Sequence, residues 1–214
     1  NAGNRYTGEY RVGATVNINN PTGHGDVLSL RALTSGSGLK YGRASYQAPI
    51  GKATVGVAYT SLAYQLGEEF ANLQAHGTAD IVSLYGSYPL VRSRNSNLYA
   101  LAGFDAKTFQ DKVDVTTPPT VTDKNARVGM LGLHGDNRDN FGGGGLNSYA
   151  LTGNFGDIDI RTPAALAADQ FVPGPHTNGS FGKLGYHFGR LQRVTERFAL
   201  YGAINGQTAS KNLD

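Results

Sequence analysis

Residues 135–145 contain the residue types of calcium-binding and phosphate-binding loops. The segment Gly135-Asp136-Asn137-Arg138-Asp139-Asn140 precedes a glycine run, Gly142–Gly145. Arg138 stands where an EF-hand loop needs an Asp or Asn ligand, and no Glu follows at the twelfth position. No Gly-Lys-Ser/Thr sequence follows the glycines, so the phosphate-loop pattern also fails. We therefore interpret the segment as a flexible turn.

Histidine and serine, the other residue types that could do chemistry, are scattered. The histidines fall in separate segments without the spacing of metal ligands: His24, His76, His134, His176 and His187. No Gly-x-Ser-x-Gly string opens a helix, as a nucleophilic serine of the hydrolase type requires. The sequence therefore predicts no catalytic residue, no metal site and no cofactor, and a protein that is not an enzyme.

Charged residues within β-like segments are the remaining candidates. Asp105 and Lys107 lie two residues apart and so share one face of a strand. A Lys facing lipid costs about 2–4 kcal/mol at the bilayer midplane, so in a membrane strand this face must point into a lumen. We expect a structural ion pair across strands, with a direct transport role as the alternative. The predicted channel-lining residues are Arg11, Arg31, Arg43, Asp105, Lys107 and Lys183.

A period of two residues runs through almost the whole chain and predicts the strands that carry these side chains. In residues 10–18, for example, Tyr10, Val12 and Val16 share one face, and Arg11 lies on the other. A phase change in residues 53–66 suggests a bulge near Thr60 to Ser61. The facing of 125–135 is ambiguous, and Arg161 to Gln170 could hold a short helical turn. The expected strands are 10–18, 26–34, 39–48, 53–66, 78–91, 97–110, 125–135, 146–160, 180–191 and 197–209.

Shorter and longer connections alternate along the chain. The shorter ones lie near residues 21, 50, 93, 140 and 194. The longer ones lie near 72, 117 and 170, and only the loop near 36 breaks the pattern. Outer-membrane barrels have short periplasmic turns and long outer loops, so the first strand is expected to run inward and the last outward.

Composition narrows the protein class. The 214 residues include 30 Gly and no Cys, and only 16% are charged and 39% hydrophobic. The net charge of +3 is too small to indicate nucleic-acid binding. No run approaches the roughly 18 apolar residues of a transmembrane helix. The polar face has few charges, and the apolar face has few bulky side chains. Both features favour a lipid-facing wall over the packed core of a soluble β-sandwich. The predicted fold class is all-β: a transmembrane antiparallel up-and-down β-barrel, of which the chain supplies about ten strands.

A set of specific strings occurs in order along the chain: Asn20-Pro21-Thr22-Gly23-His24-Gly25-Asp26, Tyr41-Gly42-Arg43-Ala44-Ser45-Tyr46-Gln47-Ala48-Pro49-Ile50-Gly51, Ala75-His76-Gly77-Thr78-Ala79, Tyr88-Pro89-Leu90-Val91-Arg92-Ser93-Arg94, Asn97-Leu98-Tyr99, Gly103-Phe104-Asp105-Ala106-Lys107 and Gly206-Gln207-Thr208-Ala209-Ser210-Lys211-Asn212-Leu213-Asp214. Taken together and in this order, they resemble the ShlB/FhaC-type transporters of two-partner secretion (TpsB), the hemolysin secretion/activation family. The resemblance covers essentially the whole chain.

The resemblance implies a domain organisation, a function and a location in the cell. Family members carry periplasmic POTRA domains before a sixteen-stranded barrel, so residues 1–214 are expected to be a partial barrel, with the POTRA domains and the C-terminal barrel strands absent. The implied function is a bacterial outer-membrane pore that secretes a partner exoprotein of the hemolysin or adhesin type. Lipid surrounds such a barrel, which is expected to be monomeric in the parent protein. A general porin and a soluble glycan-binding β-sandwich are the alternatives.

Overall fold

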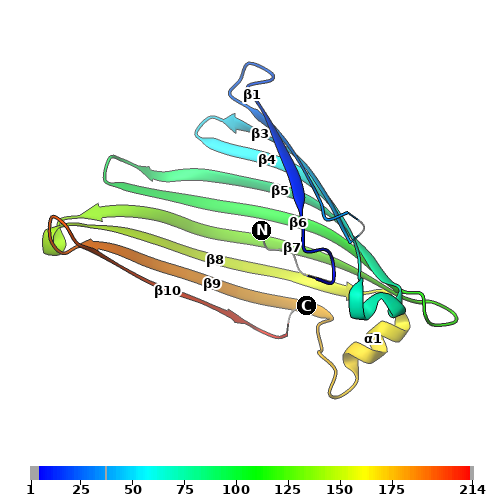
Figure 1. Cartoon of the computed structure of the whole chain (residues 1–214). Coiled ribbons are helices and arrows are strands. Elements are labelled where there is room, and N and C mark those ends of the chain that lie inside the picture. The colour runs from blue at the N-terminus through cyan, green and yellow to red at the C-terminus, as the bar shows by residue number, and fades with distance from the viewer. Residues whose placement is uncertain (1–4, 37, 213–214) are drawn as a thin grey trace.

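The computed structural model describes residues 5–36 and 38–212; Ser37 and the last two residues of the closing string, Leu213 and Asp214, lie outside this part of the chain. Ten strands form one sheet in chain order, and every neighbouring pair is antiparallel (Figure 1). The strands are β1 (Val12–Asn19), β2 (Val27–Thr34), β3 (Leu39–Ile50), β4 (Ala53–Gln65), β5 (Ala75–Arg92), β6 (Ser96–Val113), β7 (Thr120–Asp139), β8 (Gly145–Ile160), β9 (Gly179–Arg193) and β10 (Ala199–Ala209). The predicted all-β, antiparallel, up-and-down architecture is confirmed.

The two ends of the sheet differ in their connections. At the end that we call the short-turn end, the turns are 20–26, 51–52, 93–95, 140–144 and 194–198, and one of them contains the 3-10 turn η2 (Phe141–Gly143). At the opposite, long-loop end the connections are 35–38, 66–74, 114–119 and 161–178. The 3-10 helix η1 (Glu68–Leu73) and the helix α1 (Pro163–Gln170) both lie at this end (Figure 1). Helix α1 falls within the segment where a helical turn was expected.

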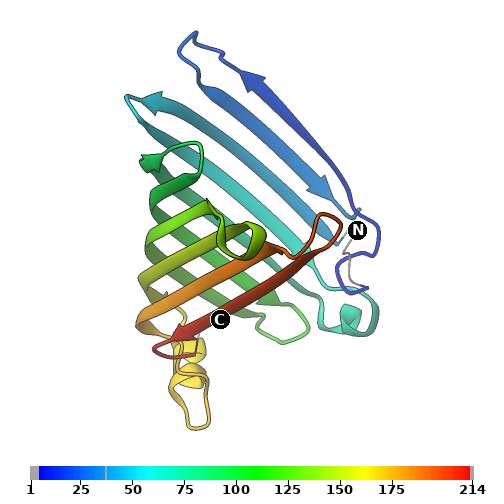
Figure 2. The same cartoon turned by 90° about the vertical axis from the view of Figure 1, so that its left-hand side faces the viewer.

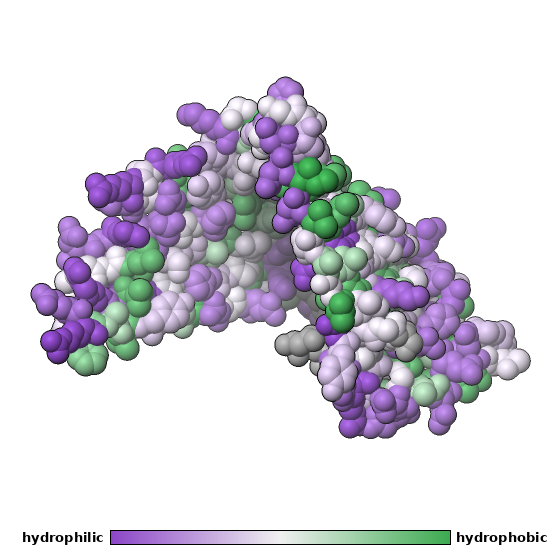
Figure 3. Space-filling view, turned by 45° about the horizontal axis from the view of Figure 1, so that its top comes forward, coloured by the Kyte–Doolittle hydropathy of each residue, from purple (hydrophilic) through white to green (hydrophobic). Residues whose placement is uncertain are grey.

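The sheet is curved and open. Figure 2 shows it as a trough with β1 and β10 as its two margins, and within the described chain these strands pair only with β2 and β9. In the space-filling view the sheet arches over a hollow, and green apolar residues lie among purple polar ones (Figure 3). Both margins therefore present unpaired backbone groups.

Hardly any apolar side chain is enclosed. Among the described residues the buried hydrophobic ones are Ala58, Ala126 and Ile160, whereas large apolar residues such as Leu131 and Phe104 are about half exposed. A β-sandwich buries the inner faces of two packed sheets. The described residues form a single sheet and have no such core, so the alternative of a soluble β-sandwich is wrong.

The expected bulge near Thr60 to Ser61 is also wrong. β4 keeps one register with β3 and β5 along its whole length. The phase change arises because Leu62 and Tyr64 lie on the polar face, where the Tyr64 hydroxyl donates to Asp111 Oδ1 at 2.6 Å. The register shifts instead between Pro89 and Val91, where proline has no N–H to give to the ladder.

Strand limits differ from the predictions mainly in β6 and β7. The loop expected at 111–124 is only 114–119, and the turn expected at Gly135–Gly145 begins at Asn140. Most of the additional strand residues are polar on both faces, with Val113 and Val121 as exceptions, so alternation of hydrophobicity does not mark them. The ambiguity within 125–135 is resolved by register: Leu131 pairs with Ala102 on the apolar face, and Met130 pairs with Gly103 on the opposite face.

Several glycines make room for an aromatic ring on the neighbouring strand. Gly129 in β7 pairs with Phe155 in β8, and a Cβ added to Gly129 would lie 2.6 Å from the Phe155 ring. Gly56 in β4 stands in the same relation to Tyr85 in β5. The many glycines of the sequence thus let rings lie flat across the strands.

Candidate channel-lining face

Register places the predicted channel-lining residues on one face of the sheet. Directly paired residues of an antiparallel sheet project to the same side, and residues two apart on a strand do so as well. Arg31 pairs with Arg43, and Lys183 is linked through Asn154 and Met130 to Gly103. Gly103 alternates with Asp105 and Lys107, and pairings across β4 and β5 connect these with Arg43. We call this side the polar face; Arg11, directly before β1, follows the same alternation.

Arg31 and Arg43 are like charges in directly opposed positions, an unfavourable arrangement unless each has its own partner. Arg43 Nη1 donates to Thr60 Oγ1 at 3.0 Å on one neighbouring strand. The guanidinium of Arg31 lies over the Tyr41 ring, 5.9 Å from the centroid. The two guanidiniums therefore turn to different partners, which reduces their mutual repulsion.

Asp105 and Lys107 form an ion pair, with Lys107 Nζ 3.2 Å from Asp105 Oδ2. Both residues lie in β6, so the pair forms along one strand, and the expectation of a pair across strands is wrong. The long lysine side chain can fold back over the intervening residue because both groups project to the same face. Both side chains are about a third exposed, so the pair adds little to stability.

A cationic cavity on the polar face was missed from the sequence. Lys107, Lys124 and Lys183 line a cavity of about 420 Å³ together with Phe109 and Phe181. Lys124 was assigned to a loop, although it belongs to β7 and pairs with Phe109 of β6. The signal that could have identified it is its alternation with Ala126 and Val128 further along the strand.

The opposite side, which we call the apolar face, carries the large exposed hydrophobic residues. By register it includes Val12, Val16, Leu28, Leu30, Tyr46, Leu98, Phe104, Leu131, Leu184 and Phe188. Towards the long-loop end this face turns polar, with Asp80, Arg127 and Asp157. The apolar band thus covers only part of the length of β5 to β8.

The string 20–26 forms a closed turn at the short-turn end. Asp26 is fully buried, and its carboxylate accepts hydrogen bonds from the Tyr46 hydroxyl at 2.8 Å and the Thr22 N–H at 3.3 Å. Burial of Asp26 opposes its ionisation, but these hydrogen bonds outweigh burial and lower the pKa of Asp26. Asn20 Oδ1 accepts from the Gly25 N–H at 2.6 Å, which closes the turn from its other side.

Loop 161–178 at the opposite end is organised around another buried carboxylate. Asp169 Oδ1 accepts from the Thr177 N–H at 2.8 Å and the Thr177 hydroxyl at 2.6 Å, and Oδ2 accepts from the Asn178 N–H at 3.1 Å. Burial of Asp169 raises its pKa, but the hydrogen bonds from Thr177 and Asn178 outweigh burial and hold the pKa well below its usual range. The ionised carboxylate therefore stabilises the loop.

Asp169→Asn is expected to open this loop at neutral pH, because an amide has one acceptor oxygen in place of two. The measurement is hydrogen exchange at the Thr177 and Asn178 amides. Since the folded pKa lies below the unfolded value of about 3.9, protection in the unmodified protein should be complete above about pH 5 and should decline only as the pH falls below about 4. The exposed Asp159→Asn is the control; unchanged Thr177 protection in Asp169→Asn would contradict the assignment.

An up-and-down antiparallel sheet with one apolar and one polar, charged face has the architecture of a transmembrane β-barrel wall. No helix among the described residues is long and apolar enough to cross a membrane. The chain belongs to the haemolysin secretion/activation protein family ShlB/FhaC/HecB, whose family model matches residues 1–124. This confirms the family suggested by the sequence strings.

Curated relatives match along the whole chain. It is 31% identical over 219 residues to the heme/hemopexin transporter protein HuxB of Haemophilus influenzae strain 86-028NP, covering 100% of this chain and 37% of that protein. HuxB of strain ATCC 51907 is 29% identical with the same coverage. The chain thus spans about a third of the length of these relatives. Among solved structures, CdiB from Acinetobacter baumannii has 12% identity and a TM-score of 0.44, over 92% of this chain and 50% of that one.

Proposed function

We propose that this chain forms part of the wall of an outer-membrane pore that secretes a partner exoprotein. Membership of the haemolysin secretion/activation family supports this function. We further propose that residues 1–214 are ten strands of a larger, monomeric barrel whose POTRA domains and remaining strands lie in other parts of a longer protein. The open sheet and the 37% coverage of the HuxB relatives support this second point.

The observation that carries the proposal is the separation of charge between the two faces. Arg11, Arg31, Arg43, Lys107 and Lys183 share the polar face with Asp105. Large apolar side chains occupy the central part of the other face. Because a charge facing lipid is costly, the polar face lines the lumen and the apolar face contacts lipid. The lumen wall is then hydrated and cationic, which suits the passage of an extended polypeptide without strong binding.

Arg43→Ala and Lys183→Ala are expected to lower the anion preference of the pore, roughly twofold each, because each removes a unit charge from the lumen potential. The experiment uses the full transporter that carries these strands, reconstituted in planar bilayers. Lys40→Ala is the matched control, since Lys40 alternates with Ala44 and Tyr46 on the apolar face and should leave selectivity unchanged. Folded barrel should form normally in all three variants.

Secretion of the partner exoprotein tests the function itself. Unmodified transporter should release the partner into the medium, and a transporter with the barrel deleted should not. Equal selectivity in the Arg43 and Lys183 variants and the unmodified pore would refute the lumen assignment. Normal ion conduction without release of any partner would favour a general porin.

A further inference from the structure

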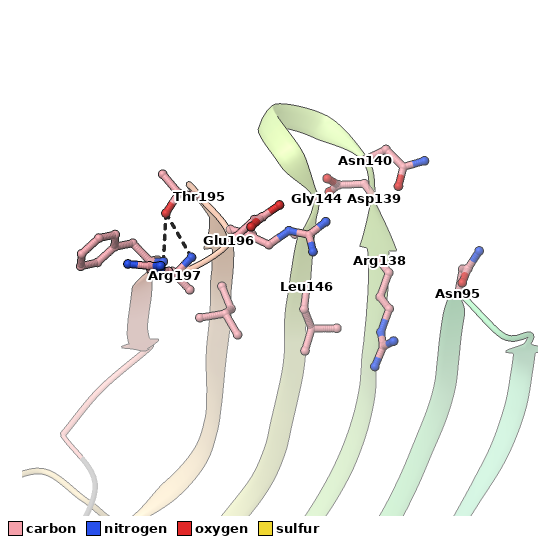
Figure 4. Close-up of a pocket in the computed structure, with 14 residues that line it drawn as sticks. Asn95, Arg138, Asp139, Asn140, Gly144, Leu146, Thr195, Glu196 and Arg197 are labelled. Carbon is pink, nitrogen blue, oxygen red and sulfur yellow. Dashed lines mark hydrogen bonds between the residues drawn. The ribbon is translucent and has the colours of Figure 1, made fainter.

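The short-turn end contains a cavity of about 640 Å³ whose walls come from three successive turns. Asn95 contributes from the turn before β6, Asn140 and Gly144 from the turn between β7 and β8, and Thr195 to Phe198 from the turn before β10 (Figure 4). The ends of β7, β8 and β9 complete it with Arg138, Leu146 and Leu191. The cavity therefore lies at the ends of the strands and is open to solvent.

This cavity belongs to the polar face. Arg138 pairs with Leu146, and Leu146 pairs with Leu191. Arg138 has the same alternation along β7 as Ala126, which pairs with Lys107. The cavity thus lies at the mouth of the same face that carries the channel-lining charges, and away from the apolar face.

Three guanidiniums border the cavity: Arg138, Arg193 and Arg197. Arg193 Nε donates to the Gly143 carbonyl at 2.8 Å, which fixes that side chain. The side chains of Arg138 and Arg197 make no hydrogen bond or ion pair within the described chain. Both groups are therefore available to an anion.

Two carboxylates also border the cavity, and one of them is already neutralised. Asp139 is held by Arg190 in a bidentate pair, at 2.6 Å from Nη1 and 2.9 Å from Nη2. Asn147 Nδ2 adds a hydrogen bond to Asp139 at 2.7 Å. Only Glu196, in the exposed turn, opposes the three arginines that line the cavity. The local charge is therefore positive.

The glycine turn that borders the cavity is held in place. Gln192 Nε2 donates to the carbonyls of Phe141 at 3.0 Å and Gly142 at 2.9 Å, and its Oε1 accepts from Arg190 Nη2 at 2.6 Å. Gly142, Gly143 and Gly144 all have positive φ, which explains the glycine run. The turn expected to be flexible is thus anchored to β9, and the cavity is preformed.

We propose that this arginine cavity binds acidic side chains of the polypeptide entering the pore. Arg138 at the end of β7 and Arg197 in the turn before β10 lie on opposite sides of the cavity, so each binds a different carboxylate of one extended segment (Figure 4). Leu146, Leu191 and Phe198 contact the neighbouring apolar residues of that segment. An extended acidic segment fits this combination better than a phospholipid headgroup, because the cavity opens on the polar face. The inference rests on the proposed secretion function and adds to it an entry site for the cargo.

The experiment measures peptide binding to the full transporter in detergent by fluorescence anisotropy. The probe is a short labelled peptide of alternating glutamate and valine, compared with the same peptide carrying glutamine for glutamate. We expect the glutamate peptide to bind about tenfold more tightly at low ionic strength. The double variant Arg138→Gln and Arg197→Gln should lose this preference, and Arg94→Gln, outside the cavity, should keep it. If the double variant does not fold, the single variants Arg138→Gln and Arg197→Gln take its place, and each should reduce the preference. Arg138→Lys, which retains the charge, should keep most of it.

Equal affinity for the two peptides, or an unchanged preference in the double variant, would overturn the inference. It would also be overturned if the double variant lost copurified phosphatidylglycerol but bound peptide normally, because the cavity would then be a lipid site. Channel conductance and partner secretion of the unmodified transporter are measured in parallel. A secreting pore without peptide preference refutes the entry site alone, whereas a transporter that releases no partner refutes the proposed function.

Discussion

Leu131→Arg is expected to abolish most of the folded barrel. Leu131 lies in the middle of the apolar band of β7, between Gly129 and Leu133, and its side chain is 58% exposed on the apolar face. In a bilayer that exposed surface contacts lipid, where an arginine costs about 2–4 kcal/mol near the midplane. Such a cost is a large part of the 5–15 kcal/mol that typically stabilises a folded protein. The fraction of folded barrel is measured by heat-modified migration on a gel.

Met130→Arg is the matched control, because Met130 is the adjacent residue and projects to the polar face, paired with Gly103. The substitution introduces the same side chain on the same strand, but into a hydrated lumen. It should leave folded barrel nearly unchanged and increase anion preference. Equal loss of folded barrel in both variants would show that the assignment of the apolar face to lipid and the polar face to the lumen is wrong.

The isolated chain is expected not to persist as an open monomer. β1 and β10 each leave one side of the strand without a partner within the described sheet. Exposed strand margins pair readily with other chains, and in lipid each unsatisfied backbone group costs several kcal/mol. Refolded in detergent, the chain should aggregate or close on itself as a smaller barrel. Size-exclusion chromatography with light scattering distinguishes these states.

Hydrogen exchange at the backbone amides of β1 and β10 provides the second readout for this experiment. A closed barrel or an aggregate should protect both strands, and in the full transporter their neighbours should protect them as well. A monodisperse monomer with rapid exchange in both strands would contradict the expectation. In that case the open sheet would be stable by itself, and the proposed larger barrel would lose its physical motive.

The strands and their facing were predictable because lipid imposes a strict alternation. Wherever one face must be apolar, as in β1 or β9, the period of two residues identifies the strand and its sides. Beyond the apolar band no face has to be apolar, so the sequence no longer alternates between apolar and polar residues. The extensions of β6 and β7, which include Lys124, could therefore not be recognised as strand. A bulge was predicted near Thr60 because the apolar residues Leu62 and Tyr64 break the alternation. Both residues simply lie on the polar face, and the strand continues without a bulge.

The arginine cavity was not predictable from local sequence. Asp139 and Arg190 are 51 residues apart, and their contact depends on the register of three strands. The residue spacing in 135–145 does not match an EF-hand loop, but spacing alone does not show what else the glycines do. Their role depends on Gln192, which reaches the turn from β9.

The strands differ greatly in length around the sheet. β5, β6 and β7 have 18, 18 and 20 residues, whereas β1 and β2 have 8 each. At about 3.4 Å per residue and a tilt of about 45°, the longest strand rises roughly 48 Å along the barrel axis and the shortest roughly 19 Å, against a hydrocarbon core of about 30 Å. In the proposed pore, β5 to β7 therefore extend beyond the bilayer and β1 and β2 do not, so the rim of the barrel is higher on one side than on the other.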